Sequence, residues 1–153
     1  MKVAVMEFDE EIKTKEIEPD ENGSYLHALQ AIVGGNIEAL DVLYGEQPLL
    51  WVNEEGIFER LMPSRAIYAN KRMEDAGFLS QMDGESVVKD GELYTIVFGP
   101  CVACSYDRNA DGEDVMRDIT DDELLMLEED LWNKRSGMEE LLRIKLHMPH
   151  GTR

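Results

Sequence analysis

The stretch LYTIVFGPCVACSY, residues 93–106, decides the fold of this chain. It contains no charged residue and is unusually apolar, which is typical of a strand buried on both faces at the centre of a sheet. Gly99 and Pro100 interrupt the run and predict a bend or a bulge within it. Because the stretch falls short of the roughly 20 residues that a membrane-spanning helix requires, we expect no membrane insertion.

Shorter strands are expected on the N-terminal side of this run. Residues 2–8 are an apolar run of strand length, and residues 12–17 alternate apolar with charged side chains. Residues 37–43 and 49–53 are two β-like runs whose short connection suits an antiparallel hairpin. Residues 70–84 carry no pattern that assigns them to a helix or a strand.

Two amphipathic helices are expected to cover the sheet. Residues 25–33 repeat apolar side chains at helical spacing after Ser24, which stands where an N-cap residue should. Thr120 followed by Glu123 is a capping box, and a broad apolar face follows it. The sequence therefore predicts an α+β fold, an antiparallel sheet of about five or six strands with helices packed on one face.

The composition is that of an acidic globular protein. Its 153 residues include 33 acidic and 15 basic side chains, which give a net charge of −18. This charge opposes contact with a phosphate backbone, so we expect no direct nucleic acid binding. One α+β domain is predicted over residues 1–133, followed by an additional C-terminal helix and a polar tail over residues 134–153.

The cellular location follows from the N-terminus and the cysteines. Acidic residues 9–11 come before any long apolar run, which is unlike a secretory signal peptide. The chain has only two cysteines, which fits a reducing compartment better than a secreted disulfide framework. We therefore expect a cytoplasmic protein.

The acidity has three interpretations: solubility, attraction to a basic partner, or mimicry of nucleic acid in a basic groove. It is concentrated in residues 107–130, which hold eleven acidic and two basic side chains. Four acidic residues of this segment are candidate contacts to a protein partner with a basic surface: Glu113, Asp114, Asp121 and Asp122.

A calcium loop is one candidate site. Asp107, Asn109 and Asp111 supply oxygens at the spacing of its first ligands, Gly112 takes the turning position, and Asp118 stands at the twelfth position. That position prefers Glu, and a strand rather than a helix precedes the loop. An acidic surface turn explains the same residues.

Zinc is a second candidate ligand. Cys101 and Cys104 form a C-x-x-C pair, and His147 and His150 form an H-x-x-H pair, which together offer four ligands of suitable type. However, residues three apart on a strand point to opposite faces unless the chain bends. The alternative interpretation is that both cysteines are inert core residues.

Arg65 is the third candidate, because a guanidinium in an acidic protein can receive a phosphate or carboxylate ligand. The simpler interpretation is an ion pair with Glu54, Glu55 or Glu59. The sequence contains no nucleophile elbow, phosphate loop, dinucleotide fingerprint or zinc-protease motif. No catalytic residue is predicted, no cofactor is required, and an enzyme has no positive support.

Four segments in order resemble a known but uncharacterised family. They are LQAIVGGNIEA (29–39), LLWVNEEG (49–56), PSRAI (63–67) and YTIVFGPCV (94–102). Together with DITDDE (118–123), they make the chain similar to domain of unknown function 3846, a family of phages, plasmids and integrative elements. The resemblance implies an accessory protein of a mobile element in a bacterial host, and it supplies no catalytic residues.

Two functions therefore remain open at the level of sequence. The first is a non-enzymatic acidic domain that binds a basic host or phage protein, of which an inhibitor of a host defence system is one form. The second is a metal- or small-ligand-binding domain that uses the segment from Asp107 to Asp118 or the pair Cys101 and Cys104.

Overall fold

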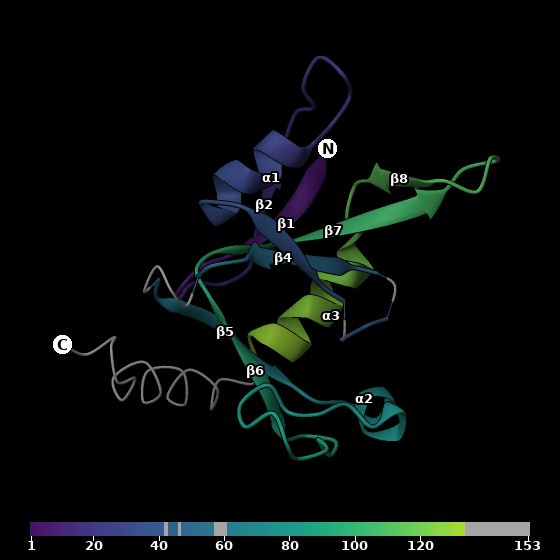
Figure 1. Ribbon diagram of the computed structural model, residues 1–153. Coiled ribbons are helices and arrows are strands. Elements are labelled where there is room, and N and C mark those ends of the chain that lie inside the picture. The colour runs from purple at the N-terminus through teal and green to yellow at the C-terminus, as the bar shows by residue number, and fades with distance from the viewer. Residues whose placement is uncertain (42, 46, 57–60, 134–153) are drawn as a thin grey trace.

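The computed structural model describes residues 1–133 apart from positions 42, 46 and 57–60. Eight strands and three helices are assigned in this part of the chain (Figure 1). In chain order they are β1 (Lys2–Met6), β2 (Lys13–Glu16), α1 (Leu26–Val33), β3 (Ile37–Leu40), β4 (Leu49–Asn53), β5 (Pro63–Tyr68), α2 (Lys71–Ala76), β6 (Leu93–Phe98), β7 (Cys101–Arg108), β8 (Asp114–Arg117) and α3 (Asp121–Leu131).

Strand β7 is the centre of the main sheet. The strand order is β2-β1-β7-β4-β3, and β8 pairs with the far end of β7. All of these pairings are antiparallel, with Ala103 opposite Ala4 of β1 on one side and opposite Leu50 of β4 on the other. The α+β class and the antiparallel six-stranded sheet predicted from the sequence are therefore confirmed.

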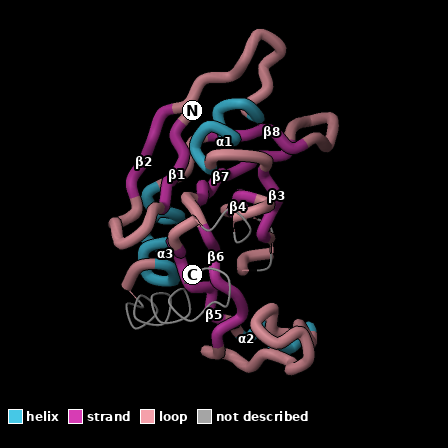
Figure 2. The backbone as a smooth tube through the Cα atoms, turned by 60° about the vertical axis from the view of Figure 1, so that its left-hand side comes forward, coloured by secondary structure: helices cyan, strands magenta, loops and turns pink. Residues whose placement is uncertain are grey.

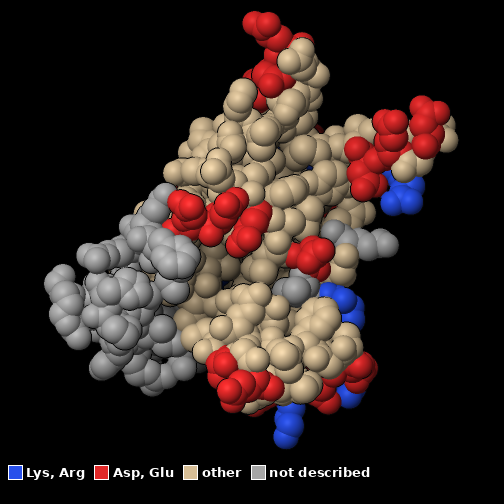
Figure 3. All heavy atoms as spheres, in the orientation of Figure 1, with Lys and Arg blue, Asp and Glu red and all other residues tan. Residues whose placement is uncertain are grey.

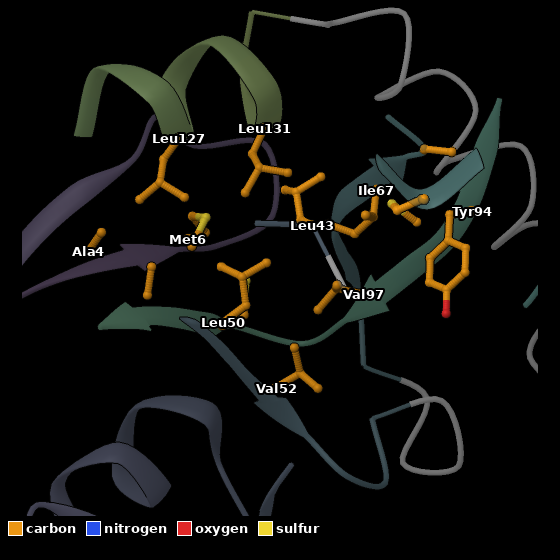
Figure 4. Packing of buried hydrophobic residues seen from close by; sticks show 14 of the residues in the cluster. Ala4, Met6, Leu43, Leu50, Val52, Ile67, Tyr94, Val97, Leu127 and Leu131 are labelled. Carbon is orange, nitrogen blue, oxygen red and sulfur yellow. The ribbon is translucent and has the colours of Figure 1, made fainter. Parts of the chain in front are cut away.

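The two faces of this sheet are both covered. Helix α1 buries Leu29 and Val33 in one hydrophobic cluster, and α3 buries Leu127 and Leu131 in another. In Figure 4 the two α3 leucines point toward the strands that carry Ala4, Met6 and Leu50. The sequence predicted both helices on one face, but neighbouring residues of β1 enter different clusters, so each face of the sheet has its own helix.

The apolar run of residues 93–106 bends where Gly99 and Pro100 predicted it. Gly99 has a φ of +91°, which favours glycine, and it separates β6 from β7. Before the bend, β6 pairs with β5 in a separate two-stranded sheet. Figures 1 and 2 show this small sheet and α2 beneath the main sheet. One continuous segment thus serves both sheets.

Helix boundaries follow local hydrogen bonds. The capping box at Thr120 and Glu123 is confirmed at the start of α3. Ser24 was expected as the N-cap of α1, but Tyr25 takes that position, while the Ser24 hydroxyl accepts the Leu26 N–H at 3.2 Å. Helix α2 falls in the segment that the pattern left unassigned, and Asn70 caps it by accepting the Met73 N–H at 3.0 Å.

The expected C-terminal helix and polar tail lie outside the described residues. Within the described residues, no helix has the length and apolar character needed to cross a membrane.

Candidate functional site

A groove opens between the β3–β4 connection and the hairpin formed by β7 and β8. Its volume is about 620 Å³. The half-buried side chains of Trp51 and Tyr106 lie in it on the α1 side of the main sheet. We call this feature the Trp51 groove, and its lining residues are Asp41, Gly45, Gln47, Leu49, Trp51, Tyr106, Asp107, Arg108 and Asp114.

The aromatic pair in the groove is held by hydrogen bonds. The indole Nε1–H of Trp51 donates to the Tyr106 hydroxyl at 3.1 Å, and the Tyr106 backbone N–H donates to Oε1 of Gln47 at 2.7 Å. Burial raises the pKa of Tyr106, so the hydroxyl remains neutral. The indole N–H is therefore already used, and the rings and the O–H proton of Tyr106 remain for contact with a ligand.

The charges around the groove are mostly negative. Asp41 is exposed, and Asp114 lies 3.5 Å from the Arg108 guanidinium in a solvent-exposed ion pair. The Asp107 carboxylate accepts a hydrogen bond of 3.0 Å from Arg117. Figure 3 shows acidic side chains gathered over the tip of the hairpin. The groove lining contains three carboxylates and a single arginine, so its net charge is negative.

The residues of the predicted calcium loop are spread along this hairpin. Asp107 lies in β7, whereas Oδ1 of Asn109 accepts the N–H groups of Asp111 and Glu113 at 2.9 Å each and thereby shapes the turn. Asp118 follows β8 and accepts the Lys2 backbone N–H at 2.8 Å. In the described part of the chain, no three Asp, Glu, Cys or His side chains gather as a metal-binding group.

The two cysteines of the predicted zinc pair lie in different cores. Cys101 packs in the α3 cluster and Cys104 in the α1 cluster, and both are fully buried. Burial raises the pKa of Cys101 to about 11 and that of Cys104 to about 12, so both are thiols at neutral pH. His147 and His150 lie outside the described residues.

Arg65 is an interior residue with only 1% of its surface exposed. Its guanidinium donates to the backbone carbonyls of Glu7 at 2.8 Å and Glu10 at 2.6 Å, and it lies 5.3 Å from the centre of the Trp132 ring. Within the described residues it makes no ion pair, so neither Glu54 nor Glu55 is its partner. Arg65 thus fastens the β1–β2 loop to β5.

The four acidic partner candidates are all exposed, and only Asp114 lines the Trp51 groove. Glu113 lies beside the hairpin turn, and Asp121 and Asp122 lie in the first turn of α3. The sequence predicts their neighbour Glu123 only as a cap, but its carboxylate also binds Arg117 at 2.9 Å.

Of the groove lining, the sequence predicted only Asp107 and Asp114 as site residues, and it gave no indication of Asp41, Gln47, Trp51 and Tyr106. The only signal within reach was the alternation in β4, whose residues Leu50 and Val52 are buried while Trp51 between them is half-exposed. The contact of Trp51 with Tyr106 spans 55 positions, so no local pattern reveals it.

The motif Asn53–Gly56, which is part of the resemblance quoted above, has a structural role in this chain. The Asn53 side chain is buried; its Nδ2 donates to the Val33 carbonyl at 3.1 Å, and its Oδ1 accepts the Glu55 N–H at 2.8 Å. A Cβ at Gly56 would lie 2.2 Å from the carbonyl oxygen of Phe98. These residues hold α1, β4 and β6 together, and they do not line the Trp51 groove.

Comparison with known proteins agrees with the resemblance. The family model described as Domain of unknown function (DUF3846) matches residues 1–129. No curated protein and no solved structure matches the chain. The match covers most of the sequence, including the central strand β7 and nearly all of α3. The chain therefore belongs to the family of DUF3846 domains.

Proposed function

We propose that this protein is a non-enzymatic binding domain whose Trp51 groove receives a basic side chain of a partner protein. One observation carries the proposal: Trp51 and Tyr106 are joined by a hydrogen bond and line the groove together with the carboxylates of Asp41 and Asp114. A Lys or Arg placed over an aromatic face gains about 0.5–2 kcal/mol, more when water is excluded.

The charge of the whole protein favours the same class of partner. A net charge of −18 attracts a basic surface over a longer distance than any single contact and raises the association rate at low salt. Asp41 and Asp114 then act at short range, since both line the groove and are exposed.

The residues of the groove are suited to binding rather than to covalent chemistry. Its described lining contains no Ser, Cys, Lys or His, so it lacks the Ser–His or Cys–His pair of a nucleophile activated by a base. We infer that the partner is retained by contact alone.

The biological setting is also part of the proposal. The resemblance noted in the sequence implies an accessory protein of a phage or mobile element that acts in the cytoplasm of a bacterial host. In that setting, an inhibitor that occupies the basic surface of a host defence protein would use both the overall charge and the groove.

The test is titration calorimetry with a seven-residue peptide that carries one Arg between Gly and Ser residues. A second peptide has citrulline, a neutral isostere, in place of Arg. We expect the Arg peptide to bind weakly at low salt and the citrulline peptide not to bind, because only Arg carries the charge that the ring faces and carboxylates attract.

Two double variants distinguish binding at the Trp51 groove from attraction by the net charge of the protein. The pair Asp41→Asn and Asp114→Asn is expected to weaken binding by about tenfold, since two neighbouring charges are lost. The pair Asp121→Asn and Asp122→Asn removes the same charge outside the groove and is expected to have less than a twofold effect. Equal losses of affinity in both double variants would show that net charge alone attracts the peptide and would refute the groove as its binding site.

A further inference from the structure

Strand β6 has one edge that no described strand covers. It pairs with β5 along one side and belongs to a sheet of two strands. Beyond the bend at Gly99, the partner of Leu49, Leu50 and Trp51 of β4 is β7, and no pairing of β4 with β6 occurs among the described residues. The bend therefore separates the path of β6 from the pairing of β4 with β7, and within the described residues no strand pairs with the second edge of β6.

The backbone of Ile96 faces this open edge. The Tyr94 carbonyl accepts the Gln81 N–H at 2.9 Å, away from β5, whereas the Val97 carbonyl lies on the β5 side and accepts the Ser64 hydroxyl at 3.4 Å. In a strand, the N–H and C=O of one residue point to the same side and alternate from residue to residue. Both backbone groups of Ile96 thus point in the same direction as those of Tyr94.

A cleft of about 390 Å³ lies against this edge. We call it the Ile96 cleft, and its lining residues are Glu38, Leu40, Val52, Asn53, Glu54, Gly56, Gln81, Met82, Thr95, Ile96, Val97 and Phe98. The four consecutive residues from β6 indicate that the strand presents its backbone edge as well as side chains.

The side chains across the cleft define what it accepts. Leu40 and Val52 offer apolar surface from the β3–β4 hairpin, and Met82, which is 44% exposed, offers a flexible apolar wall. Glu38 and Glu54 are exposed, and the described lining contains no Lys or Arg to balance them. The cleft therefore favours an apolar segment with basic flanks.

We propose that the Ile96 cleft is a strand-addition site for an extended segment of a partner protein that carries a small apolar residue next to Lys or Arg. The segment pairs with the backbone of Ile96, places its apolar side chain against Leu40 and Met82, and places its basic side chain beside Glu38 or Glu54. Backbone bonds supply affinity in such complexes, and the side-chain pockets supply specificity.

This proposal stands apart from the Trp51 groove. Leu40 and Val52 pack with the α3 cluster, whereas Trp51 packs with the α1 cluster on the other face of β4. A negative binding result at one site therefore does not count against the proposal for the other site.

The experiment follows amide hydrogen exchange by NMR on the intact protein. The probe is a nine-residue peptide with alternating Val and Thr between terminal lysines. In the free protein, the Ile96 amide is expected to exchange faster than that of Val97, whose amide faces β5. At a peptide concentration ten times Kd, exchange at Ile96 is expected to slow by about tenfold.

Modified probes and exposed charges provide the controls. N-methylation of alternate amides in one register removes the donors to Ile96 and is expected to abolish binding, whereas methylation in the other register is tolerated. The variants Glu38→Lys and Glu54→Lys are each expected to weaken binding by roughly fivefold at low salt. Glu18→Lys, an exposed change outside the cleft, is expected to have almost no effect.

Three results would overturn the proposal. The first is binding of the peptide without slower exchange at Ile96. The second is equal binding of both N-methylated peptides. The third is a dimer in sedimentation equilibrium that protects the Ile96 amide without peptide, because the occupant would then be a second copy of the chain.

Discussion

The side chains of Trp51 and Tyr106, from neighbouring antiparallel strands, join through a hydrogen bond of 3.1 Å from the indole nitrogen to the phenol oxygen. Each ring belongs to a different strand of the main sheet, so the bond ties together two aromatic residues that line the Trp51 groove. A rigid pair loses little conformational freedom when a ligand arrives, which favours recognition by a small number of contacts.

Removing the phenol oxygen tests that relationship. In Tyr106→Phe the half-buried indole N–H loses its acceptor, and we expect the free energy of unfolding to fall by about 1 kcal/mol. Urea denaturation followed by circular dichroism measures this change. Tyr25→Phe is the control, because Tyr25 is also half-buried and no side-chain hydrogen bond of its hydroxyl occurs among the described residues. Equal losses in the two variants would contradict a role for the bond.

The close approach of Gly56 to Phe98 makes a second prediction. An added Cβ at Gly56 would meet a backbone carbonyl at 2.2 Å, so the chain must shift. We expect Gly56→Ala to lower the free energy of unfolding by about 2–3 kcal/mol. Gly112→Asn serves as the control in the same urea titration, because its φ of +79° suits Asn and nothing lies within 4 Å of the added Cβ. A Gly56→Ala loss no larger than that of the control would disprove the steric account.

The carboxyl of Glu123 gives a prediction about the stability of the protein at low pH. Burial opposes its charge, but hydrogen bonds from Arg117 and the Thr120 backbone outweigh this effect and lower its pKa to about 2, from an ordinary 4.5. Because the folded-state pKa is the lower one, its stabilisation is complete above pH 4.5 and is lost as the pH falls toward 2.

We therefore expect Glu123→Gln to be less stable than the wild type by about 2 kcal/mol at neutral pH, since solvent screens part of the interaction. Urea titrations between neutral pH and pH 3 should show the two proteins converging as the pH falls. A difference that stays constant over this range would mean that the carboxylate charge is not responsible.

The thiols of Cys101 and Cys104 should be unreactive in the folded protein. Both are fully buried, and burial raises their pKa values to about 11 and about 12. At pH 8, iodoacetamide is expected to label neither thiol within the time that labels both in urea, because the thiolate is the reactive form. Mass spectrometry of the intact chain counts the adducts. Rapid labelling of either cysteine without denaturant would contradict this burial.

Arg65 provides a prediction about the β1–β2 loop. Its planar guanidinium reaches the carbonyls of both Glu7 and Glu10, a span that a single ammonium group does not reproduce. We expect Arg65→Lys to lower the free energy of unfolding by about 3 kcal/mol. Arg108→Lys, at an exposed ion pair, should stay within about 0.5 kcal/mol of the wild type. Similar small effects at both positions would rule out this role for Arg65.

Sequence patterns revealed the elements whose signals are local. The apolar run around Val97 and Val102 identified the central strand, Gly99 identified its bend, and Thr120 with Glu123 identified the start of α3. Each of these signals depends on side chains within a few residues of one another, so the sequence carries it directly.

Other features depended on distant contacts or on weak patterns. Strand β8 has no buried residue, and α2 buries only Met73, so neither shows an apolar face in the sequence. Arg65 resembled a ligand-binding residue because its environment of backbone carbonyls is created only when β5 meets the β1–β2 loop. The contact of Trp51 with Tyr106 and the pairing of Ile96 with Ala66 likewise arise only when distant strands come together.

The position of β7 also bears on how the chain is made on the ribosome. Within the main sheet, β1 and β4 are joined only through β7, which begins at Cys101. At roughly 5–20 residues per second, synthesis reaches β7 only after β1 and β4 have waited for seconds without their shared partner. The nascent chain can therefore form only the separate β1–β2 and β3–β4 pairs until β7 has been made, and a product that stops before Cys101 lacks the strand that unites the two halves of the sheet.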